Sequence, residues 1–204
     1  ATNAGRTLYD YARRMLALKK EADRAVGDVS GALKGRVIAG GSTIPGTYYM
    51  PRAVAEFRRL NPGVSVVLRI GDTKEITSLV SGGEIELGVI GKKPKEKNLS
   101  CSELWEDELI LAVPASHPLS AAGVKNITPV MLAREPFLLR EKGSATRGLM
   151  ESGLAEKGLT IGNLNVVCEL GSTEAVKQGI LNGAGVSILS RVAIKNEVAA
   201  GLLK

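Results

Sequence analysis

Apolar and polar positions divide the chain into segments with two kinds of repeat. From residue 36 onward, short runs rich in apolar residues alternate with longer segments in which apolar residues recur every three or four positions. The short runs predict strands, which cover residues 36–39, 64–70, 86–90, 109–113, 137–140, 165–170 and 186–189. The longer segments predict helices, which end near Leu60, Gly82, Arg134, Lys157, Asn182 and Ala200. This alternation is typical of an α/β fold with mainly parallel sheets.

The first thirty residues follow a different pattern, that of one long helix. Apolar residues there alternate three and four positions apart, which is the spacing of a coiled-coil seam. The seam consists of Leu8, Tyr11, Met15, Leu18, Ala22, Ala25 and Val29. Its four larger residues, up to Leu18, are predicted to contact a second copy of the chain. Packing against the chain's own domain stays open as an alternative, because two of the seam residues are small alanines.

Positive charge is concentrated in this helix. The chain has 204 residues and a formal net charge of +6. Residues 1–36 contain eight Lys or Arg and four acidic residues, so they carry +4 and leave +2 for the rest. A basic arm on a nearly neutral body fits an anionic neighbour such as DNA, and a solvated helix face explains the charge equally well. The sequence has no apolar run of about 18 residues and starts with no apolar export signal, so we expect a cytoplasmic protein without a membrane partner.

Motifs for catalysis or metal binding are sparse. The two cysteines, Cys101 and Cys168, match no metal-binding spacing and are expected to be reduced, partly buried thiols. The single histidine, His117, is the one candidate base for a Ser-His-Asp or Cys-His site, which disfavours catalysis. Residues 40–46 fit neither a Walker loop nor a dinucleotide fingerprint. We therefore expect no catalytic residue, no metal and no cofactor, and hence a protein that is not an enzyme.

Small hydroxyl residues follow four of the predicted strands. They are Ser42, Thr43, Thr73, Ser144, Thr146, Ser172 and Thr173. Turns of this kind lie at the carboxyl ends of the strands of an open α/β sheet, where ligands bind. The start of a helix offers unpaired N–H groups and a partial positive charge, to which hydroxyl groups add donors. The turns can therefore hold an inorganic oxyanion or a small carboxylate, although each hydroxyl is also explained as a helix N-cap. Arg147 either adds charge to this site or forms a salt bridge on the helix surface.

An ordered set of motifs resembles the LysR-type transcriptional regulator family. No single motif is specific, but together they run in family order over nearly the whole chain. They are Ala4-Gly5, Tyr11–Arg14, Gly35–Gly40, Pro51 with Phe57 and Asn61-Pro62, Gly71–Ile76, Leu87–Ile90, Val113–Leu119, Arg140–Arg147 and Gly183–Leu189.

The resemblance implies two Rossmann-like subdomains, as in type 2 periplasmic binding proteins, preceded by a linker helix. It places the dimerisation linker at 1–34, regulatory subdomain I at 36–113 plus 190–204, and regulatory subdomain II at 114–189. The family's effector lies in the cleft between the subdomains, and the seven hydroxyl residues map to that cleft. The family's N-terminal winged helix-turn-helix has no counterpart in this sequence, so the chain alone should not read DNA bases.

The resemblance and the hydroxyl-bearing turns together predict the effector-sensing region of a bacterial transcription regulator. A small anionic effector would bind in the cleft and rearrange a homodimer or homotetramer, and the linker helix would pass the change to DNA-binding domains. The alternative is a free-standing solute-binding protein for a small anion. That protein would share the cleft but would need no coiled-coil helix, so the N-terminal helix favours the regulator.

Overall fold

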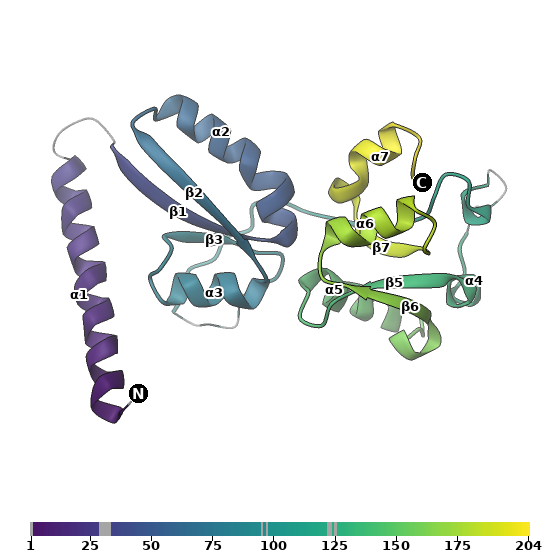
Figure 1. Cartoon of the computed structure of the whole chain (residues 1–204), viewed down its shortest axis with the longest axis horizontal. Coiled ribbons are helices and arrows are strands. Elements are labelled where there is room, and N and C mark those ends of the chain that lie inside the picture. The colour runs from purple at the N-terminus through teal and green to yellow at the C-terminus, as the bar shows by residue number, and fades with distance from the viewer. Residues whose placement is uncertain (1, 29–33, 95, 97, 122–123, 125) are drawn as a thin grey trace. The chain divides into compact units, whose positions relative to one another are not determined.

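The computed structural model describes residues 2–28, 34–94, 96, 98–121, 124 and 126–204. Two compact units make up the chain, Ala1–Ser100 and Cys101–Lys204 (Figure 1). The first unit begins with one long helix, α1 (Asn3–Asp28), as predicted. Val29, the last residue of the predicted seam, lies outside the described residues.

The sheet of the first unit is parallel, in the strand order β2-β1-β3. Its strands are β1 (Gly35–Ser42), β2 (Val64–Gly71) and β3 (Leu87–Val89). Helix α3 (Thr73–Ser81) connects β2 to β3. A π-helical turn (Pro45–Tyr49) leads from β1 into α2 (Met50–Leu60). Pro51 lies in the first turn of α2, and the helical residues run on through it without interruption.

Two adjacent glycines of β1 show that helices cover both faces of this sheet. A Cβ atom on Gly40 would lie 2.5 Å from the Cδ1 atom of Ile85 and 3.1 Å from methyl groups of Ile76 on α3. A Cβ atom on Gly41 would collide with the backbone of Gly46 in the π-helical turn. Successive residues of a strand point to opposite faces, so α3 covers one face and the segment entering α2 covers the other. Only glycine permits both close approaches.

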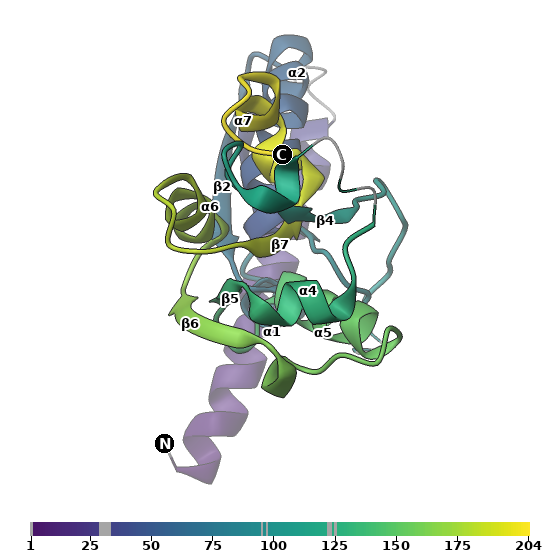
Figure 2. The ribbon, with the colours of Figure 1, turned by 90° about the vertical axis from the view of Figure 1, so that its right-hand side faces the viewer.

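The second unit contains two pairs of strands. Strands β4 (Leu109–Ala112) and β7 (Ser187–Ser190) are antiparallel, whereas β5 (Pro136–Arg140) and β6 (Asn165–Leu170) are parallel. A β-bridge between Phe137 and Val186 joins the two pairs. The helices of this unit are α4 (Pro129–Arg134), α5 (Ala145–Ala155), α6 (Thr173–Leu181) and α7 (Lys195–Ala199) (Figures 1 and 2). The mixture of strands and helices confirms the predicted α/β fold class.

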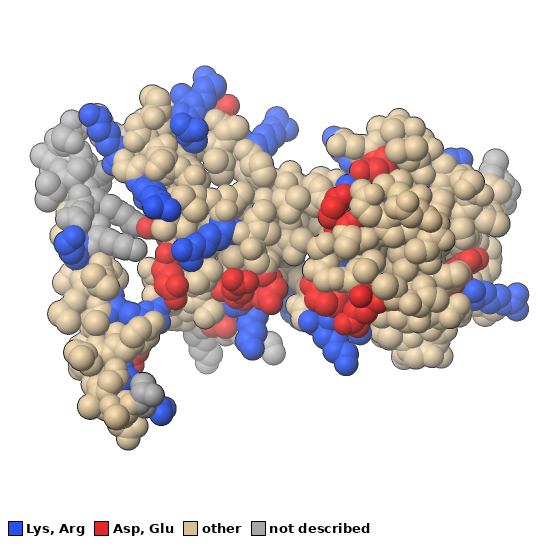
Figure 3. Space-filling view, in the orientation of Figure 1, with Lys and Arg blue, Asp and Glu red and all other residues tan. Residues whose placement is uncertain are grey.

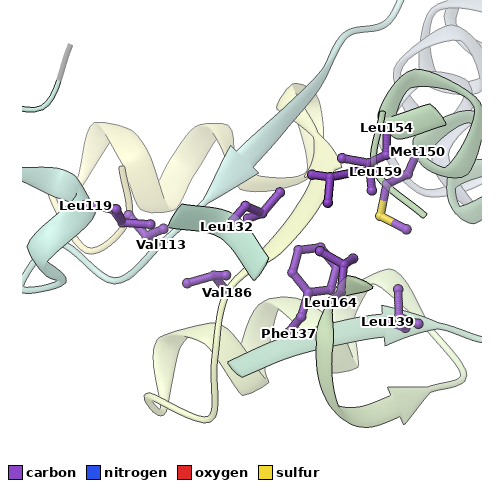
Figure 4. Packing of buried hydrophobic residues seen from close by; sticks show 10 residues of the cluster. All are labelled: Val113, Leu119, Leu132, Phe137, Leu139, Met150, Leu154, Leu159, Leu164 and Val186. Atoms are coloured by element: carbon purple, nitrogen blue, oxygen red, sulfur yellow. The ribbon is translucent and has the colours of Figure 1, made fainter. Parts of the chain in front are cut away.

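Apolar residues of β5 alternate between two cores. Phe137 and Leu139 belong to a cluster that includes Met150 and Leu154 of α5 (Figure 4). Leu138 belongs to a second cluster with apolar residues of α6. Phe137, Leu138 and Leu139 are each at most 2% exposed. The alternation follows from the two-residue period of a strand, and it places helices on both faces of the second sheet.

The end of the chain packs into the second unit, which differs from the expected placement of residues 190–204 in subdomain I. Ile194 and Leu203 are fully buried in the same cluster as Leu138. The backbones of Val113 and Lys204 exchange two hydrogen bonds, of 2.8 and 3.0 Å. The division between units accordingly falls after Ser100 rather than after residue 113. The order of elements could not reveal this, because it does not say which core an element joins.

Candidate anion-binding site

At the carboxyl edge of the first sheet lie three of the predicted site residues. Ser42 ends β1, opposite Gly71 of β2 in the strand register, and it is 5% exposed. The Ser42 hydroxyl accepts a hydrogen bond of 3.1 Å from the backbone N–H of Gly91, which follows β3. Thr43 comes next in the chain and is partly buried. All three strands of this sheet therefore end around the Ser42 hydroxyl.

Thr73 adds a buried hydroxyl group without a partner. It is the first residue of α3, whose N-cap is Asp72. The Asp72 carboxylate accepts a hydrogen bond of 2.7 Å from the backbone N–H of Glu75, so the cap of the helix does not need the threonine. The Thr73 Oγ1 atom is buried and has no hydrogen-bond partner among the residues that the structure describes. Leaving a buried hydroxyl unpaired costs about 1–3 kcal/mol, which a ligand at this edge would recover.

Four more predicted residues lie at the carboxyl edge of the second unit. Arg140 at the end of β5 is opposite Leu170 at the end of β6, so the turns that follow these strands start side by side. Ser144 and Ser172 cap α5 and α6, as the alternative interpretation expects. Thr146, in the first turn of α5, is 8% exposed, and its position is not that of a cap.

The Thr173 hydroxyl is hydrogen-bonded to the side chain of Arg140, which the sequence analysis did not identify as a site residue. The guanidinium of Arg140 donates a hydrogen bond of 2.5 Å to the Thr173 Oγ1 atom, at the first residue of α6. Thr173 is 1% exposed, and the Arg140 side chain is 4% exposed. Arg140 also donates two hydrogen bonds of 2.7 Å to the carboxylate of Glu141. The signal in the sequence was a charged residue that ends a run of core residues, because such a charge requires a partner when it is buried.

Arg147 forms salt bridges, as one of its two open interpretations expects, but it is buried rather than on the helix surface. Its guanidinium lies 2.8 Å from the Glu151 carboxylate and 2.7 Å from the Glu169 carboxylate. It also donates a hydrogen bond of 2.8 Å to the carbonyl of Arg140. The hydrogen bond to Glu151 and, as the second-largest cause, the hydrogen bond to Glu169 raise the pKa of Arg147 above its usual value. Arg147 therefore holds together α5 and the ends of β5 and β6 and has both its acidic partners in place.

The seam residues of α1 expose their apolar side chains. The exposed fractions of Leu8, Tyr11, Met15 and Leu18 lie between 58% and 66%. An exposed stripe of this kind is available to a partner, whose identity stays a prediction. Lys and Arg side chains lie over α2 as well as along α1, so positive charge is not confined to the N-terminal helix (Figure 3).

The histidine and the two cysteines that the sequence analysis considered are not grouped into a site among the described residues. His117 accepts a hydrogen bond of 3.2 Å at Nδ1 from the backbone N–H of Leu119, and its Nε2 atom lies 3.3 Å from Glu135. Cys101 and Cys168 are free and exposed, whereas the sequence predicts partly buried thiols. Among the described residues, no group of three or more His, Cys, Asp or Glu could hold a metal ion. Within the same residues, no helix is long and apolar enough to cross a membrane.

Sequence comparisons match the chain to one family model and to transcription regulators. The profile of the family described as LysR substrate binding domain matches residues 30–204. A probable RuBisCO transcriptional regulator of Cyanidium caldarium is 36% identical over 205 residues, and the HTH-type transcriptional activator CmpR of Synechocystis is 31% identical over 202 residues. Each alignment covers 99% of this chain and 64% of the relative. The chain thus spans less than two thirds of the length of these relatives.

Solved structures with the same fold include a regulatory domain. The CcmR regulatory domain of Synechocystis PCC6803, solved in complex with 2-PG, has a TM-score of 0.74 and 32% identity, over 84% of this chain and 79% of that one. The cofactor-binding domain of the Cbl transcriptional regulator has a TM-score of 0.71 over 84% of this chain and 73% of that one. Its identity is 22%, so it supports the fold alone. The neighbours confirm the predicted fold of LysR regulatory domains.

Proposed function

This chain belongs to the family of LysR substrate-binding domains, and on that premise we propose that it is the effector-sensing region of a LysR-type transcription regulator. Its effector is a small anion, either an inorganic oxyanion or a small carboxylate. The observation that carries the proposal is the likeness to the CcmR regulatory domain, which was solved with the anion 2-PG.

The chemistry of the two carboxyl edges supports an anionic ligand. The first unit supplies the Thr73 hydroxyl, which is buried and unpaired, next to the start of a helix. The second unit supplies the buried cation Arg140 together with the first turns of α5 and α6. Hydroxyl groups, helix N-termini and guanidinium groups all favour negative charge. That both edges contribute to one cleft remains part of the proposal.

Signal transmission requires the effector to bind two arrangements of the protein with different affinity. A ligand shifts such an equilibrium only by that difference. We place the change in the relation between the subdomains of a homodimer or homotetramer, in the cytoplasm. The α1 helix would carry it to DNA-binding domains of the full-length regulator. The exposed seam from Leu8 to Leu18 supports a helix partner, because it leaves four large side chains in water.

A role in regulation also accounts for the absence of a catalytic motif in the sequence. The curated relatives named above are transcription regulators. No feature of the described residues favours the alternative of a free-standing transport protein. We therefore assign ligand sensing rather than catalysis or transport.

Isothermal titration calorimetry with phosphate, sulfate, small carboxylates and 2-PG tests the proposal. Thr73→Val removes the unpaired hydroxyl but keeps the side-chain shape, so it should leave stability unchanged or raise it. It should weaken anion binding about tenfold, the effect of roughly 1.5 kcal/mol for a hydrogen bond to a charged group. Thr128→Ala is the control, because the Thr128 hydroxyl caps α4 by accepting a hydrogen bond of 3.3 Å from the backbone N–H of Met131, and α4 leads into the amino end of β5. It should cost about 1 kcal/mol of stability without changing affinity.

Failure to detect binding of any anion to the unmodified chain would refute the proposed effector class. Binding that Thr73→Val and Thr128→Ala weaken equally would place the anion elsewhere.

A further inference from the structure

Arg140 is a buried cation at the carboxyl edge of the second unit, and its partners come from two different places. Its side chain is 4% exposed. One contact is distant in sequence, the Thr173 hydroxyl at the start of α6. The other is local, the carboxylate of the adjacent residue Glu141, which accepts from Nε and Nη2 at 2.7 Å each. The guanidinium of Arg140 therefore forms a bidentate pair with the Glu141 carboxylate, in which Nε and Nη2 each donate to one oxygen.

Glu141 lies in a turn, whereas the partners of the neighbouring cation Arg147 lie on regular elements. Its side chain is 33% exposed, and it begins the turn between β5 and α5. Gly143 in the same turn has φ of +100°, a backbone conformation that only glycine adopts readily. Arg147, by contrast, is held by three groups that lie on a helix and on strands, including the carboxylates of Glu151 and Glu169.

From this contrast we propose that Arg140 is the residue that binds the anionic group of the effector, and that Glu141 occupies its guanidinium when no effector is bound. An incoming carboxylate or phosphate takes the place of the Glu141 carboxylate on Nε and Nη2 of Arg140. The Thr173 hydroxyl stays on Nη1 and fixes the plane of the guanidinium. The inference rests on the proposed function and adds to it the residue that selects the ligand and an internal competitor for the site.

This arrangement explains how a buried cation can serve as a binding group. An arginine buried without a counter-charge would destabilise the fold by several kcal/mol. Glu141 supplies the counter-charge in the free protein, so the site is stable before the effector arrives. The two-pronged guanidinium favours anions with two oxygens on one centre, namely carboxylates and phosphates, over monatomic anions such as chloride. The affinity that is measured is lowered by competition with Glu141.

Two matched variants separate this competition from a general effect of charge. Glu141→Gln removes the competing charge from Arg140, while the amide oxygen still accepts a hydrogen bond. Glu151→Gln removes an equivalent charge from Arg147. The Glu151 carboxylate lies 2.8 Å from the Arg147 guanidinium, and the Glu151 side chain is 43% exposed. Calorimetry with inorganic phosphate, acetate and 2-PG, at constant ionic strength, measures affinity for both. Glu141→Gln should bind about tenfold more tightly than the unmodified chain, and Glu151→Gln should be unchanged.

Thermal unfolding with and without the same anions provides a second measurement. Glu141→Gln should melt below the unmodified chain without anion and should gain more from saturating anion, because the anion replaces the missing counter-charge. Arg140→Gln should lose anion binding. Equal affinities of Glu141→Gln and the unmodified chain would overturn the inference but leave the proposed function standing. So would equal tightening by Glu151→Gln, or binding retained by Arg140→Gln. Absence of anion binding in all four proteins would overturn both.

Discussion

Leu203 is the residue whose replacement tests most sharply how the second unit is built. Its side chain is fully buried, in the cluster that contains Leu138 and Ile194. Replacing it by alanine removes three carbon groups, one methine and two methyls, which at about 0.8 kcal/mol each contribute about 2.4 kcal/mol. The cavity left behind adds to this loss. We therefore expect the free energy of unfolding to fall by about 3 kcal/mol, within the usual range of roughly 2–5 kcal/mol for such a change.

Leu202 provides a matched control one residue away. It is 56% exposed, so Leu202→Ala should change stability by less than about 0.5 kcal/mol. Urea unfolding can be followed by the fluorescence of Trp105, the single tryptophan, which lies in the second unit. With a slope of about 2 kcal/mol per molar urea, Leu203→Ala should lower the midpoint by about 1.5 M.

Amide hydrogen exchange then locates the effect of Leu203→Ala. Exchange should accelerate in α6 and β5, which contribute to the cluster around Leu203. Equal midpoints for the Leu202 and Leu203 variants would refute the reasoning. Acceleration in β1 and β2 instead of α6 would do the same, because it would assign the end of the chain to the first unit.

Three further predictions concern the first sheet, α1 and α6. Gly40→Ala should destabilise the first unit by about 1–3 kcal/mol in urea unfolding, since the new methyl group would lie 2.5 Å from an isoleucine side chain. Met15→Glu should abolish self-association in sedimentation experiments, whereas Leu16→Glu, which is exposed but off the seam, should not. A hydrogen bond from Gln178 lowers the pKa of Glu174, so its contribution is present above the usual pKa of a glutamate and is lost as pH falls through the folded value. The stability difference between the unmodified chain and Glu174→Gln should thus shrink as the pH falls below the usual pKa of a glutamate, and it should be under about 0.5 kcal/mol because Glu174 is 56% exposed.

Local periodicity predicts most elements of this fold. Each strand and α-helix that the structure describes has a counterpart in the sequence pattern, because the two periods depend only on neighbouring residues. The short 3-10 helices Pro118–Ser120 and Ile161–Asn163 were not predicted. The cap assigned to Asp72 was also readable, since the acceptor and the N–H that it binds are three residues apart. The packing of residues 190–204 into the second unit could not be predicted from the sequence, because Leu203 reaches its core through contacts with residues far away in the sequence.

The candidate site was predictable in its hydroxyl groups and not in its charges. Ser144 and Ser172 follow strands in the sequence, and their position at helix starts is a local property. Arg140 was missed because its burial depends on Thr173, which is 33 residues away. Sequence also could not decide whether Arg147 is a ligand contact, since its partner Glu169 lies on another element.

We propose that an anionic effector binds at the carboxyl edges of β1 and β2 in the first unit and of β5 and β6 in the second. Amide hydrogen exchange of the unmodified chain, with and without saturating 2-PG or phosphate, tests it most directly. The account predicts slower exchange in the turns after β1, β2, β5 and β6, at residues 42–43, 72–74, 144–147 and 172–174. Unchanged exchange in these turns under conditions where calorimetry detects a bound anion would contradict it.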